Sequence, residues 1–239
     1  MSHSIQKNSL RILIILPCFN EGAMIGDLLH EISKLNPEWD TLVVDDCSTD
    51  HTYKVASAMS PCVKLVANLG IGGAVQTAIK YAFENDYDLC LQVDGDGQHP
   101  PDQIRILLNA YLTLPFNIII GSRFIEEIGF QSTPLRRVGI QFISKVISWC
   151  FKYTVTDPTS GFRLMDRKAI QLFSLEYPLD FPEPVSLAIA SEAGLSIKEV
   201  PVIMKPRRTG TSSITGLKTV TYMLRVIGYL FLIRIARHI

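Results

Sequence analysis

The chain has 239 residues, of which 47% are hydrophobic and 19% charged. This suits one large α/β domain or two small ones and excludes a disordered protein. Its 23 basic and 23 acidic side chains give zero formal charge, so the overall charge does not argue for nucleic-acid binding. Residues 1–120 nevertheless carry seven Lys and Arg against fourteen Asp and Glu, and residues 121–239 carry sixteen against nine. The asymmetry suggests metal-binding carboxylates in the first half and anion recognition in the second, although an uneven solvated surface would also produce it.

The first half alternates short apolar runs with longer helical patterns, which is typical of βαβ units and a parallel sheet. Strands are predicted at Ile12–Leu16, Thr41–Asp45, Val63–Ala67, Leu89–Val93 and Asn117–Ile120. Helices are predicted between them, near Ala23–Lys34, His51–Met59, Gly73–Glu84 and Pro101–Leu112.

The second half is less regular. Its predicted elements are a helix near Leu135–Phe151, a turn at Thr156–Ser160, a helix near Glu183–Ala193, a strand at Ile197–Met204 and a polar loop through Arg207–Thr215. No repeat and no long linker separates the halves. We therefore predict one domain over residues 11–213, preceded by a tail at residues 1–10 and followed by a helix at residues 214–239.

Cysteine usage and the chain ends predict the compartment. The five cysteines form no CxxC pair, which favours reduced thiols in a cytosolic protein. The polar start runs directly into the first strand, so we expect no secretion signal. Near the C-terminus, Arg225 and Arg234 leave only Val226 to Ile233 uncharged between them, far fewer than the roughly 20 residues that cross a bilayer.

Polar residues and glycines follow each of the first four predicted strands. In open α/β sheets, ligands bind outside the carboxyl ends of the strands. The four loops are Pro17 to Glu21, Asp45 to Asp50, Asn68 to Gly73 and Asp94 to His99. They predict a polar ligand at one edge of the sheet.

The fourth loop reads Asp-Gly-Asp-Gly-Gln-His over residues 94–99. Alternate residues Asp94, Asp96 and Gln98 place oxygen atoms that suit Mg²⁺ or Mn²⁺. An acidic turn before a helix is the alternative, and His99 is expected to set the turn before two prolines rather than to bind metal. The glycine loop follows the third strand instead of the first, and no GxxxxGK[ST] is present, which disfavours a dinucleotide-binding dehydrogenase and a P-loop NTPase.

Seven motifs occur in a characteristic order: LPCFNE, LVVDDCSTD, ANLGIGGA, QVDGDGQHPP, GSRF, DPTSGFR and RRTGTSS. Together they resemble family 2 glycosyltransferases of the polyprenyl-phosphate, dolichol-phosphate mannose synthase-like branch. The resemblance runs from Arg11 to about Ser213. It implies a single α/β domain of GT-A type, with a Rossmann-like, mostly parallel sheet flanked by helices. Residues 11–120 would be the nucleotide-sugar half and residues 121–213 the acceptor half. A Tyr common in the first motif is Cys18 here, and the last motif lacks its usual Lys.

The resemblance also implies roles for individual residues. Contacts to the nucleotide sugar would come from Pro17, Asn20, Glu21, Asp46, Asn68, Gly70 and Gly72. A divalent cation, Mg²⁺ or Mn²⁺, would be held against the diphosphate by Asp94, Asp96 and Gln98. The acceptor and diphosphate side would be lined by Arg123, Arg137, Arg163, Arg207 and Ser212.

The nature of the acceptor decides whether a base is needed. A hydroxyl must lose its proton to a carboxylate, for which Glu183 or Asp157 is a candidate. A phosphate monoester is largely dianionic at neutral pH and needs cations instead. Arg163 could instead only neutralise Asp157, and Arg136 is expected on a solvated helix face.

The basic second half favours the phosphate acceptor. The expected reaction is an inverting, metal-dependent transfer of a sugar from a UDP- or GDP-sugar to a polyprenyl phosphate, undecaprenyl or dolichyl, for cell-surface glycan synthesis. Asp96, Arg123, Arg137 and Glu183 are the candidate catalytic residues. The alternatives are transfer to a glycan hydroxyl and, more remotely, metal-dependent nucleotidyl transfer.

The C-terminal segment is apolar and basic. From Lys198 onward there are eight Lys and Arg and one acid, Glu199, and apolar side chains surround most of the predicted helix. Such a helix is buried, bound to a partner or placed on an anionic membrane surface. We expect peripheral attachment to the cytoplasmic face of a membrane and a small membrane-protein subunit as partner.

Overall fold

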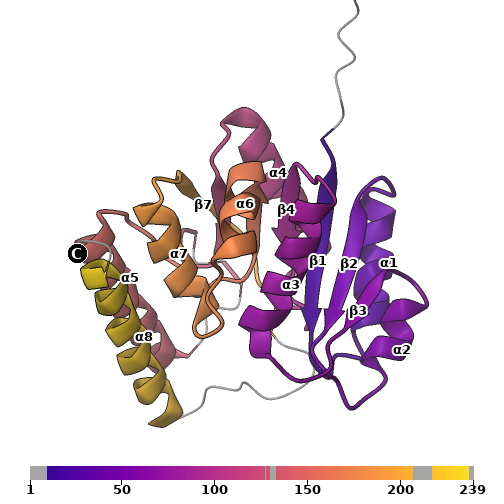
Figure 1. The fold of residues 1–239 in the computed structure, drawn as a ribbon, viewed down its shortest axis with the longest axis horizontal. Helices are drawn as coiled ribbons and strands as arrows, with labels where there is room; N and C mark the ends of the chain where they lie inside the picture. The colour runs from indigo at the N-terminus through magenta and orange to yellow at the C-terminus, as the bar shows by residue number, and fades with distance from the viewer. Residues whose placement is uncertain (1–9, 127, 130–132, 207–216, 237–239) are drawn as a thin grey trace, which may run out of the picture.

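A computed structural model describes residues 10–126, 128–129, 133–206 and 217–236 (Figure 1). The strands are β1 (Ile12–Cys18), β2 (Asp40–Asp45), β3 (Cys62–Lys64), β4 (Leu89–Gln92), β5 (Ile118–Ser122), β6 (Arg163–Asp166) and β7 (Ile197–Pro201). The α-helices are α1 (Ile25–Leu35), α2 (Thr52–Ser57), α3 (Gly70–Glu84), α4 (Ile104–Thr113), α5 (Pro134–Phe151), α6 (Arg167–Leu175), α7 (Pro182–Glu192) and α8 (Leu217–Ala236). A 3₁₀ turn, η1 (Pro101–Gln103), precedes α4.

The strands form one sheet in the order β3-β2-β1-β4-β6-β5-β7. Neighbouring strands are parallel except at β6, which runs antiparallel to both β4 and β5. Arg163, the first residue of β6, lies opposite Gln92 of β4 and Ile120 of β5. The mostly parallel α/β sheet expected from the sequence is confirmed, whereas β6 and α6 were not predicted.

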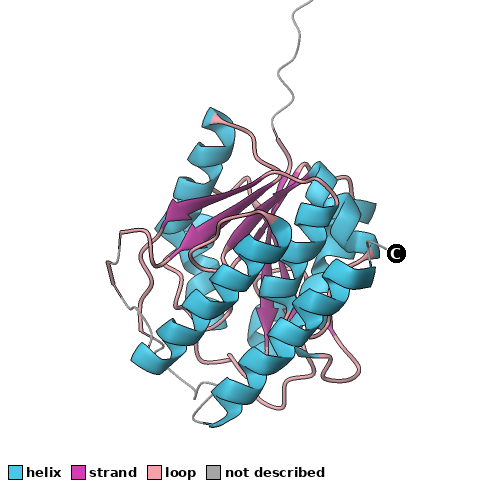
Figure 2. Ribbon diagram, turned by 90° about the vertical axis from the view of Figure 1, so that its left-hand side faces the viewer, coloured by secondary structure: helices cyan, strands magenta, loops and turns pink. Residues whose placement is uncertain are grey.

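Both faces of the sheet are covered by helices (Figure 2). Successive side chains of a strand point to opposite faces, so Leu13 and Ile15 of β1 enter one hydrophobic cluster and Ile14 and Leu16 enter another. Helices α3 and α6 contribute to the first cluster, and α1 and α4 to the second. A parallel strand buried on both faces reads as a continuous apolar run rather than an alternating one, which explains the run from Ile12 to Leu16.

Two strands end earlier in the structure than the sequence predicts. β3 stops at Lys64 instead of Ala67 because its partner β2 ends at Asp45, the residue opposite Lys64. β7 stops at Pro201 instead of Met204, opposite Ser122 at the end of β5. In both cases the neighbouring strand, which the local pattern does not reveal, sets the limit.

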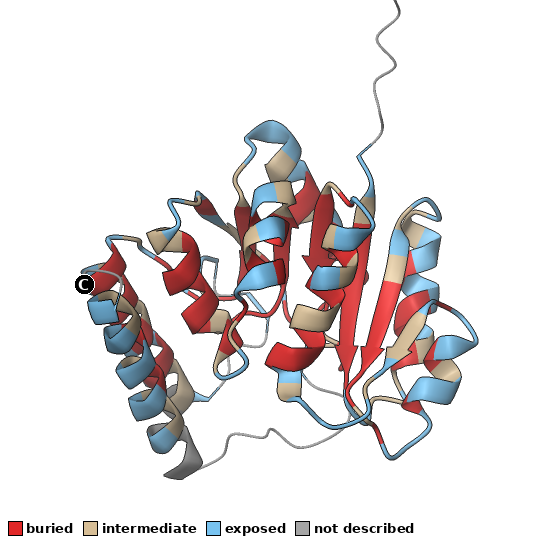
Figure 3. Cartoon of the chain, viewed as in Figure 1, coloured by how far each residue is buried: buried red, intermediate tan, exposed pale blue. Residues whose placement is uncertain are grey.

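The C-terminal helix α8 packs against α5 and α7 at one side of the molecule (Figure 1). Val226 and Leu230 are fully buried in the larger hydrophobic cluster, and Gly139 of α5 leaves room for the side chain of Met223. The outward side of α8 is exposed (Figure 3). Among the helices of the described residues, none combines the length and apolarity needed to cross a membrane.

Candidate active site

The two carboxylates after β4 differ in exposure. The Asp94 side chain is 30% exposed, and its Oδ1 accepts a hydrogen bond of 3.1 Å from Nε2 of Gln92. Asp96 is only 4% exposed, and its Oδ1 accepts the backbone N–H of Gln98 at 3.0 Å. This short local hydrogen bond bends the loop so that both carboxylates lie at the carboxyl end of β4.

Gly161, from the DPTSGFR segment, lies directly against Asp94. A Cβ at position 161 would come within 2.9 Å of both Asp94 carboxylate oxygens, closer than van der Waals contact allows. In the sequence this glycine is distinguished only as part of the DPTSGFR motif. A side chain at position 161 would therefore force the Asp94 carboxylate or the β6 segment to shift.

Gln98 connects the same loop to the segment before Arg207. Its Nε2 donates to the Lys205 carbonyl at 3.3 Å, and Lys205 N donates to the Gln98 carbonyl at 2.9 Å. Two carboxylates and an amide oxygen are hard donors that fit Mg²⁺ or Mn²⁺, which proteins bind with one or two carboxylates plus substrate phosphates. Within the described ranges, no group of three or more His, Cys, Asp or Glu side chains is arranged to hold a metal ion.

The loops after β1 and β2 are held together by side-chain hydrogen bonds. Asn20 adopts a left-handed backbone with φ 57°, and its Oδ1 accepts the Thr49 N–H at 2.9 Å. Glu21 N donates to Thr52 Oγ1 at 2.8 Å. Pro17, by contrast, is buried within β1. Asn20 and Glu21 thus lie at the edge where a ligand is expected, and Pro17 supports them from inside the strand.

Asp46 joins the loop after β2 to the start of α3. Its buried Oδ1 accepts the Leu69 N–H at 2.7 Å, and its carbonyl accepts Asn68 Nδ2 at 3.2 Å. Gly70 follows with φ +75°, a conformation that favours glycine. Gly72 is buried against the loop between α6 and α7, since a Cβ there would lie 2.6 Å from the Pro178 carbonyl oxygen. Its observed role is therefore to let α3 approach this loop closely.

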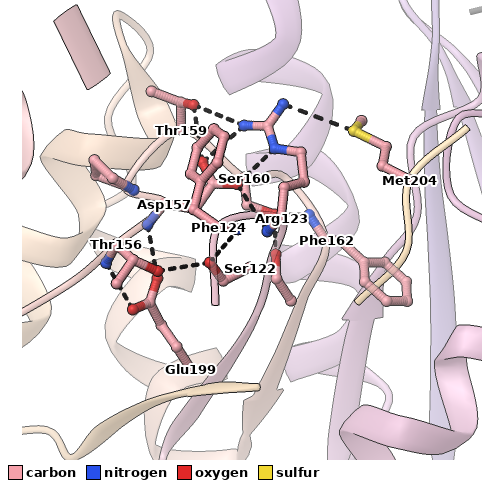
Figure 4. Close-up of polar contacts among 12 residues, drawn as sticks. Ser122, Arg123, Phe124, Thr156, Asp157, Thr159, Ser160, Phe162, Glu199 and Met204 are labelled. Carbon is pink, nitrogen blue, oxygen red and sulfur yellow. Dashed lines mark hydrogen bonds and ion pairs between the residues drawn. The ribbon is translucent and has the colours of Figure 1, made fainter. Parts of the chain in front are cut away.

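Arg123, directly after β5, forms a buried ion pair with Asp157 (Figure 4). Its Nε lies 2.6 Å from Oδ2 and its Nη2 2.7 Å from Oδ1 of Asp157, a two-pronged geometry that suits guanidinium and carboxylate. Nη2 also donates to Thr159 Oγ1 at 3.0 Å. Arg123 is 5% exposed and Asp157 is fully buried, so the pair holds the DPTSGFR segment at the end of β5.

Glu199 of β7 fixes the other side of Asp157. Its two carboxylate oxygens accept the backbone N–H groups of Thr156 at 2.6 Å and Asp157 at 2.8 Å. Burial raises the pKa of Glu199, and these hydrogen bonds act in the opposite direction. Glu199 was not predicted as a site residue, because its partners are backbone atoms more than 40 residues away.

Arg163 is a buried arginine whose described hydrogen bonds all go to neutral oxygens. Nε donates to the Ser160 carbonyl at 2.7 Å, Nη1 to Ser186 Oγ at 2.8 Å and Nη2 to the Pro158 carbonyl at 3.1 Å. The alternative that Arg163 serves to neutralise Asp157 is wrong, because Arg123 occupies that carboxylate. Arg163 therefore brings a positive charge to the edge where β4 and β5 end.

Glu183 lies in the first turn of α7, partly exposed, after Phe181 in a left-handed conformation with φ 50°. Burial raises the pKa of the Glu183 carboxyl; the charge of Arg163 acts to lower it and that of Asp94 to raise it further. These opposing influences show that Glu183 shares the electrostatic environment of both the carboxylate loop and Arg163.

The start of α5 adds two arginines. Arg137 lies over the Phe124 ring, with its Cζ 5.6 Å from the ring centroid. The expectation that Arg136 sits on a solvated helix face is wrong: it is half-buried, and burial together with the charge of Arg123 lowers its pKa. Tyr222 of α8 also lies near this group. Burial is the main cause that raises its pKa, while the charge of Glu183 raises it further and that of Arg136 acts to lower it. No local motif marks Tyr222 in the sequence.

His99 is buried beside the carboxylate loop. Its ring stacks on Phe162 at a centroid distance of 4.8 Å, and Nε2 lies 3.7 Å from Asp94 Oδ2. No described residue forms a hydrogen bond with either ring nitrogen. Arg207 and Ser212, predicted to contact the substrate, lie outside the described residues.

The fold and this edge together define a class: an α/β protein with a carboxylate loop and buried arginines gathered at the carboxyl ends of its strands, an arrangement suited to phosphorylated ligands. The model of glycosyl transferase family 2 matches residues 13–173. The chain belongs to this family and is a glycosyltransferase.

Two relatives whose names specify glycosyltransferases agree with this assignment. The chain is 29% identical to the UDP-N-acetylglucosamine–dolichyl-phosphate N-acetylglucosaminyltransferase of Methanococcus voltae, over 80% of this chain and 84% of the relative. It is 31% identical to the undecaprenyl-phosphate mannosyltransferase of Micrococcus luteus, over 87% and 88%. A solved glucosyl-3-phosphoglycerate synthase from Mycobacterium tuberculosis, in complex with Mn²⁺, UDP-glucose and phosphoglyceric acid, has a TM-score of 0.74 at 20% identity and covers 95% of this chain and 80% of its own. This likeness supports the GT-A fold.

Proposed function

We propose that this protein is an inverting, metal-dependent glycosyltransferase that moves a sugar from a UDP- or GDP-sugar to a polyprenyl phosphate such as undecaprenyl or dolichyl phosphate. The names of the relatives from M. voltae and M. luteus support this acceptor class. The product would serve cell-surface glycan or glycoconjugate synthesis.

One structural observation carries the proposal: the antiparallel β6 brings an acidic and a basic group to the same strand edge. Gly161, two residues before Arg163, lies against the Asp94 carboxylate. Arg123, which follows β5, holds the same segment through its ion pair with Asp157. A sugar donor with a diphosphate and an acceptor with a phosphate both require compensation of negative charge. The juxtaposition supplies carboxylates for a cation and arginines for an anion.

On the donor side, Asp94, Asp96 and Gln98 would hold Mg²⁺ or Mn²⁺. The cation supplies electrostatic stabilisation of the departing nucleoside diphosphate. Asn20, Glu21, Asp46, Asn68 and the glycine loop would position the nucleotide, and Arg207 and Ser212 would add contacts to the diphosphate. A single displacement at the anomeric carbon then inverts its configuration.

On the acceptor side, the phosphate oxygen acts as the nucleophile. A phosphate monoester has its second pKa near 6 and is already largely dianionic at neutral pH, so Arg123, Arg137 and Arg163 have to hold and orient it rather than remove a proton. Arg123 and Arg163 are buried, and charge-assisted hydrogen bonds are strongest where water is excluded.

A glycan hydroxyl is the second candidate acceptor, and Glu183 is the observation that favours it. A carboxyl whose pKa is raised by burial is suited to general base catalysis near neutral pH. In that reaction Glu183 accepts the hydroxyl proton as the oxygen attacks the anomeric carbon.

A lipid acceptor also implies contact with a membrane. The proposed layout is a glycosyltransferase domain at residues 11–213 followed by a membrane- or partner-associating helix at residues 214–239. The protein would attach peripherally to the cytoplasmic face, with a small membrane-protein subunit as a further partner. The basic C-terminal segment supports this arrangement.

The test is product detection by mass spectrometry. Membranes that contain the protein are incubated with UDP- and GDP-sugars, Mg²⁺ or Mn²⁺, and undecaprenyl or dolichyl phosphate. We expect a glycosyl-lipid monophosphate and release of the nucleoside diphosphate. Transfer to a glycan hydroxyl that is lost in Glu183→Gln would support the second candidate, and release of pyrophosphate would indicate nucleotidyl transfer and refute both.

A further inference from the structure

Helices α5 and α8 pack against each other, and both expose large apolar side chains. Trp149 is 76% exposed and Phe142 54%, and Trp149 contacts Phe231 of α8 edge-on, at a centroid distance of 6.0 Å. We define the α5–α8 face as seven exposed residues: Val138, Phe142 and Trp149 of α5, and Leu224, Phe231, Leu232 and Ile235 of α8. Exposed apolar groups of this kind mark interaction sites when they are contiguous.

The same two helices contain no acidic residue. The sequences of Pro134–Phe151 and Leu217–Ala236 include six Lys and Arg and no Asp or Glu. Lys145 on α5 and Arg225 on α8 are exposed, whereas Arg234 is paired with Glu192 of α7. Apolar side chains interspersed with positive charge complement an anionic lipid surface, in which the rings enter the acyl boundary and the cations meet the headgroups.

We infer that the α5–α8 face rests on an anionic lipid membrane. Helix α5, which lies in the middle of the sequence, forms half of this contact. The proposed attachment through residues 214–239 involves only one of these helices. The inner side of α8 packs on the protein core through Val226 and Leu230. Only its outer side is therefore available to a membrane, and the exposed side of α5 enlarges that surface.

The position of α5 links this surface to the site. Near the start of α5, Arg137 lies over the ring of Phe124, which is the residue after Arg123. The helix then continues to Trp149 on the exposed face. If the acceptor is a lipid phosphate, as proposed above, its headgroup reaches the arginines while its chain stays in the membrane. This part of the inference rests on the proposed function.

The chain carries its own reporter for the test. It has two tryptophans. Trp39 lies just before β2 and packs against the second hydrophobic cluster, which contains no residue of α5 or α8, so Trp39→Phe leaves Trp149 as the single tryptophan. We expect a blue shift of Trp149 and quenching by brominated acyl chains with phosphatidylglycerol vesicles, and weaker binding with phosphatidylcholine alone or at high salt. No spectral change with phosphatidylglycerol would overturn the inference.

Matched variants separate membrane contact from general charge effects. Lys145→Glu with Arg225→Glu should weaken vesicle binding by at least about tenfold, since each basic residue near the surface contributes to the attraction. Phe142→Glu should act similarly. The controls are Lys54→Glu and Lys198→Glu, exposed on α2 and β7, and Leu175→Glu, exposed at the end of α6. Equal losses in test and control variants would contradict the inference.

Two further measurements separate this inference from the proposed function. With a short-chain polyprenyl phosphate in detergent micelles, the face variants should retain transfer and lose it only on vesicles. Vesicle binding without glycosyl-lipid product would refute the proposed function and leave the membrane face standing. A second copy of the chain is the competing occupant: a dimer by light scattering that the Phe142→Glu variant dissociates, with no lipid-dependent change at Trp149, would refute the membrane face.

Discussion

Arg123 and Asp157 form a two-pronged ion pair inside the protein, with Nε–Oδ2 and Nη2–Oδ1 distances of 2.6 and 2.7 Å. The pair joins the end of β5 to the segment that leads into β6. One of the candidate catalytic arginines is therefore also a structural element of the site.

Removal of Arg123 should destabilise the fold as well as the site. Arg123→Ala leaves the Asp157 carboxylate buried without its partner, which costs about 3–5 kcal/mol of unfolding free energy in comparable cases. Urea denaturation followed by circular dichroism measures this. Asp86→Asn is the control, because its ion pair with Arg167 is exposed and such pairs contribute about 0–1 kcal/mol. Equal losses of unfolding free energy in the two variants would show that the buried pair contributes no more to stability than the exposed one.

Asp96→Asn should remove metal-dependent nucleotide binding without unfolding the protein. The amide has nearly the same shape but no charge to hold a divalent cation, and we expect transfer to fall by at least about 100-fold. Calorimetric titration with UDP or GDP, with and without Mn²⁺, tests this. Asp102→Asn, an exposed acid in the 3₁₀ turn η1 that precedes α4, should bind like the wild type. Unchanged Mn²⁺ dependence in Asp96→Asn would argue against the proposed metal site.

Gly161→Ala should displace the Asp94 carboxylate. The new methyl group would lie 2.9 Å from both oxygens, so the carboxylate has to rotate or the β6 segment has to move. We expect weaker Mn²⁺-dependent nucleotide binding and reduced transfer. Gly228→Ala in α8, where a Cβ meets no atom within 4 Å, is the matched control. Full activity of Gly161→Ala would mean that the position of Asp94 is not critical.

Glu183 should make stability depend on pH. Burial raises the pKa of its carboxyl in the folded state above the value of about 4.3 typical of the unfolded chain, so the folded state binds the proton more tightly. Its favourable contribution is present below pH about 4 and is lost as pH rises through the folded pKa. Glu183→Gln should therefore raise the urea midpoint, relative to the wild type, more at pH 8 than at pH 4. A constant difference at both pH values would contradict the raised pKa, and Glu84→Gln on the exposed end of α3 is the control.

Several features of this protein follow from its sequence because they depend on local order. The apolar runs that became β1, β2, β4 and β5 predict a buried parallel sheet, since strands covered on both faces are apolar throughout. The polar loops that follow the strands predict the edge where a ligand binds. The order of the seven motifs predicts the glycosyltransferase family, which the family model confirms.

The tertiary structure alone decided which distant residues meet. β6 was not predicted because four residues carry too weak a pattern, yet its antiparallel direction places Gly161 against Asp94 and Arg163 opposite Gln92. The partner of Asp157 proved to be Arg123 rather than Arg163, a choice made by strand pairing across more than 30 residues. The exposed side of α5 likewise became evident only when α8 was seen to cover another side. Local sequence encodes strand and helix periods, whereas the pairing of charges and the uncovered faces depend on how the elements pack.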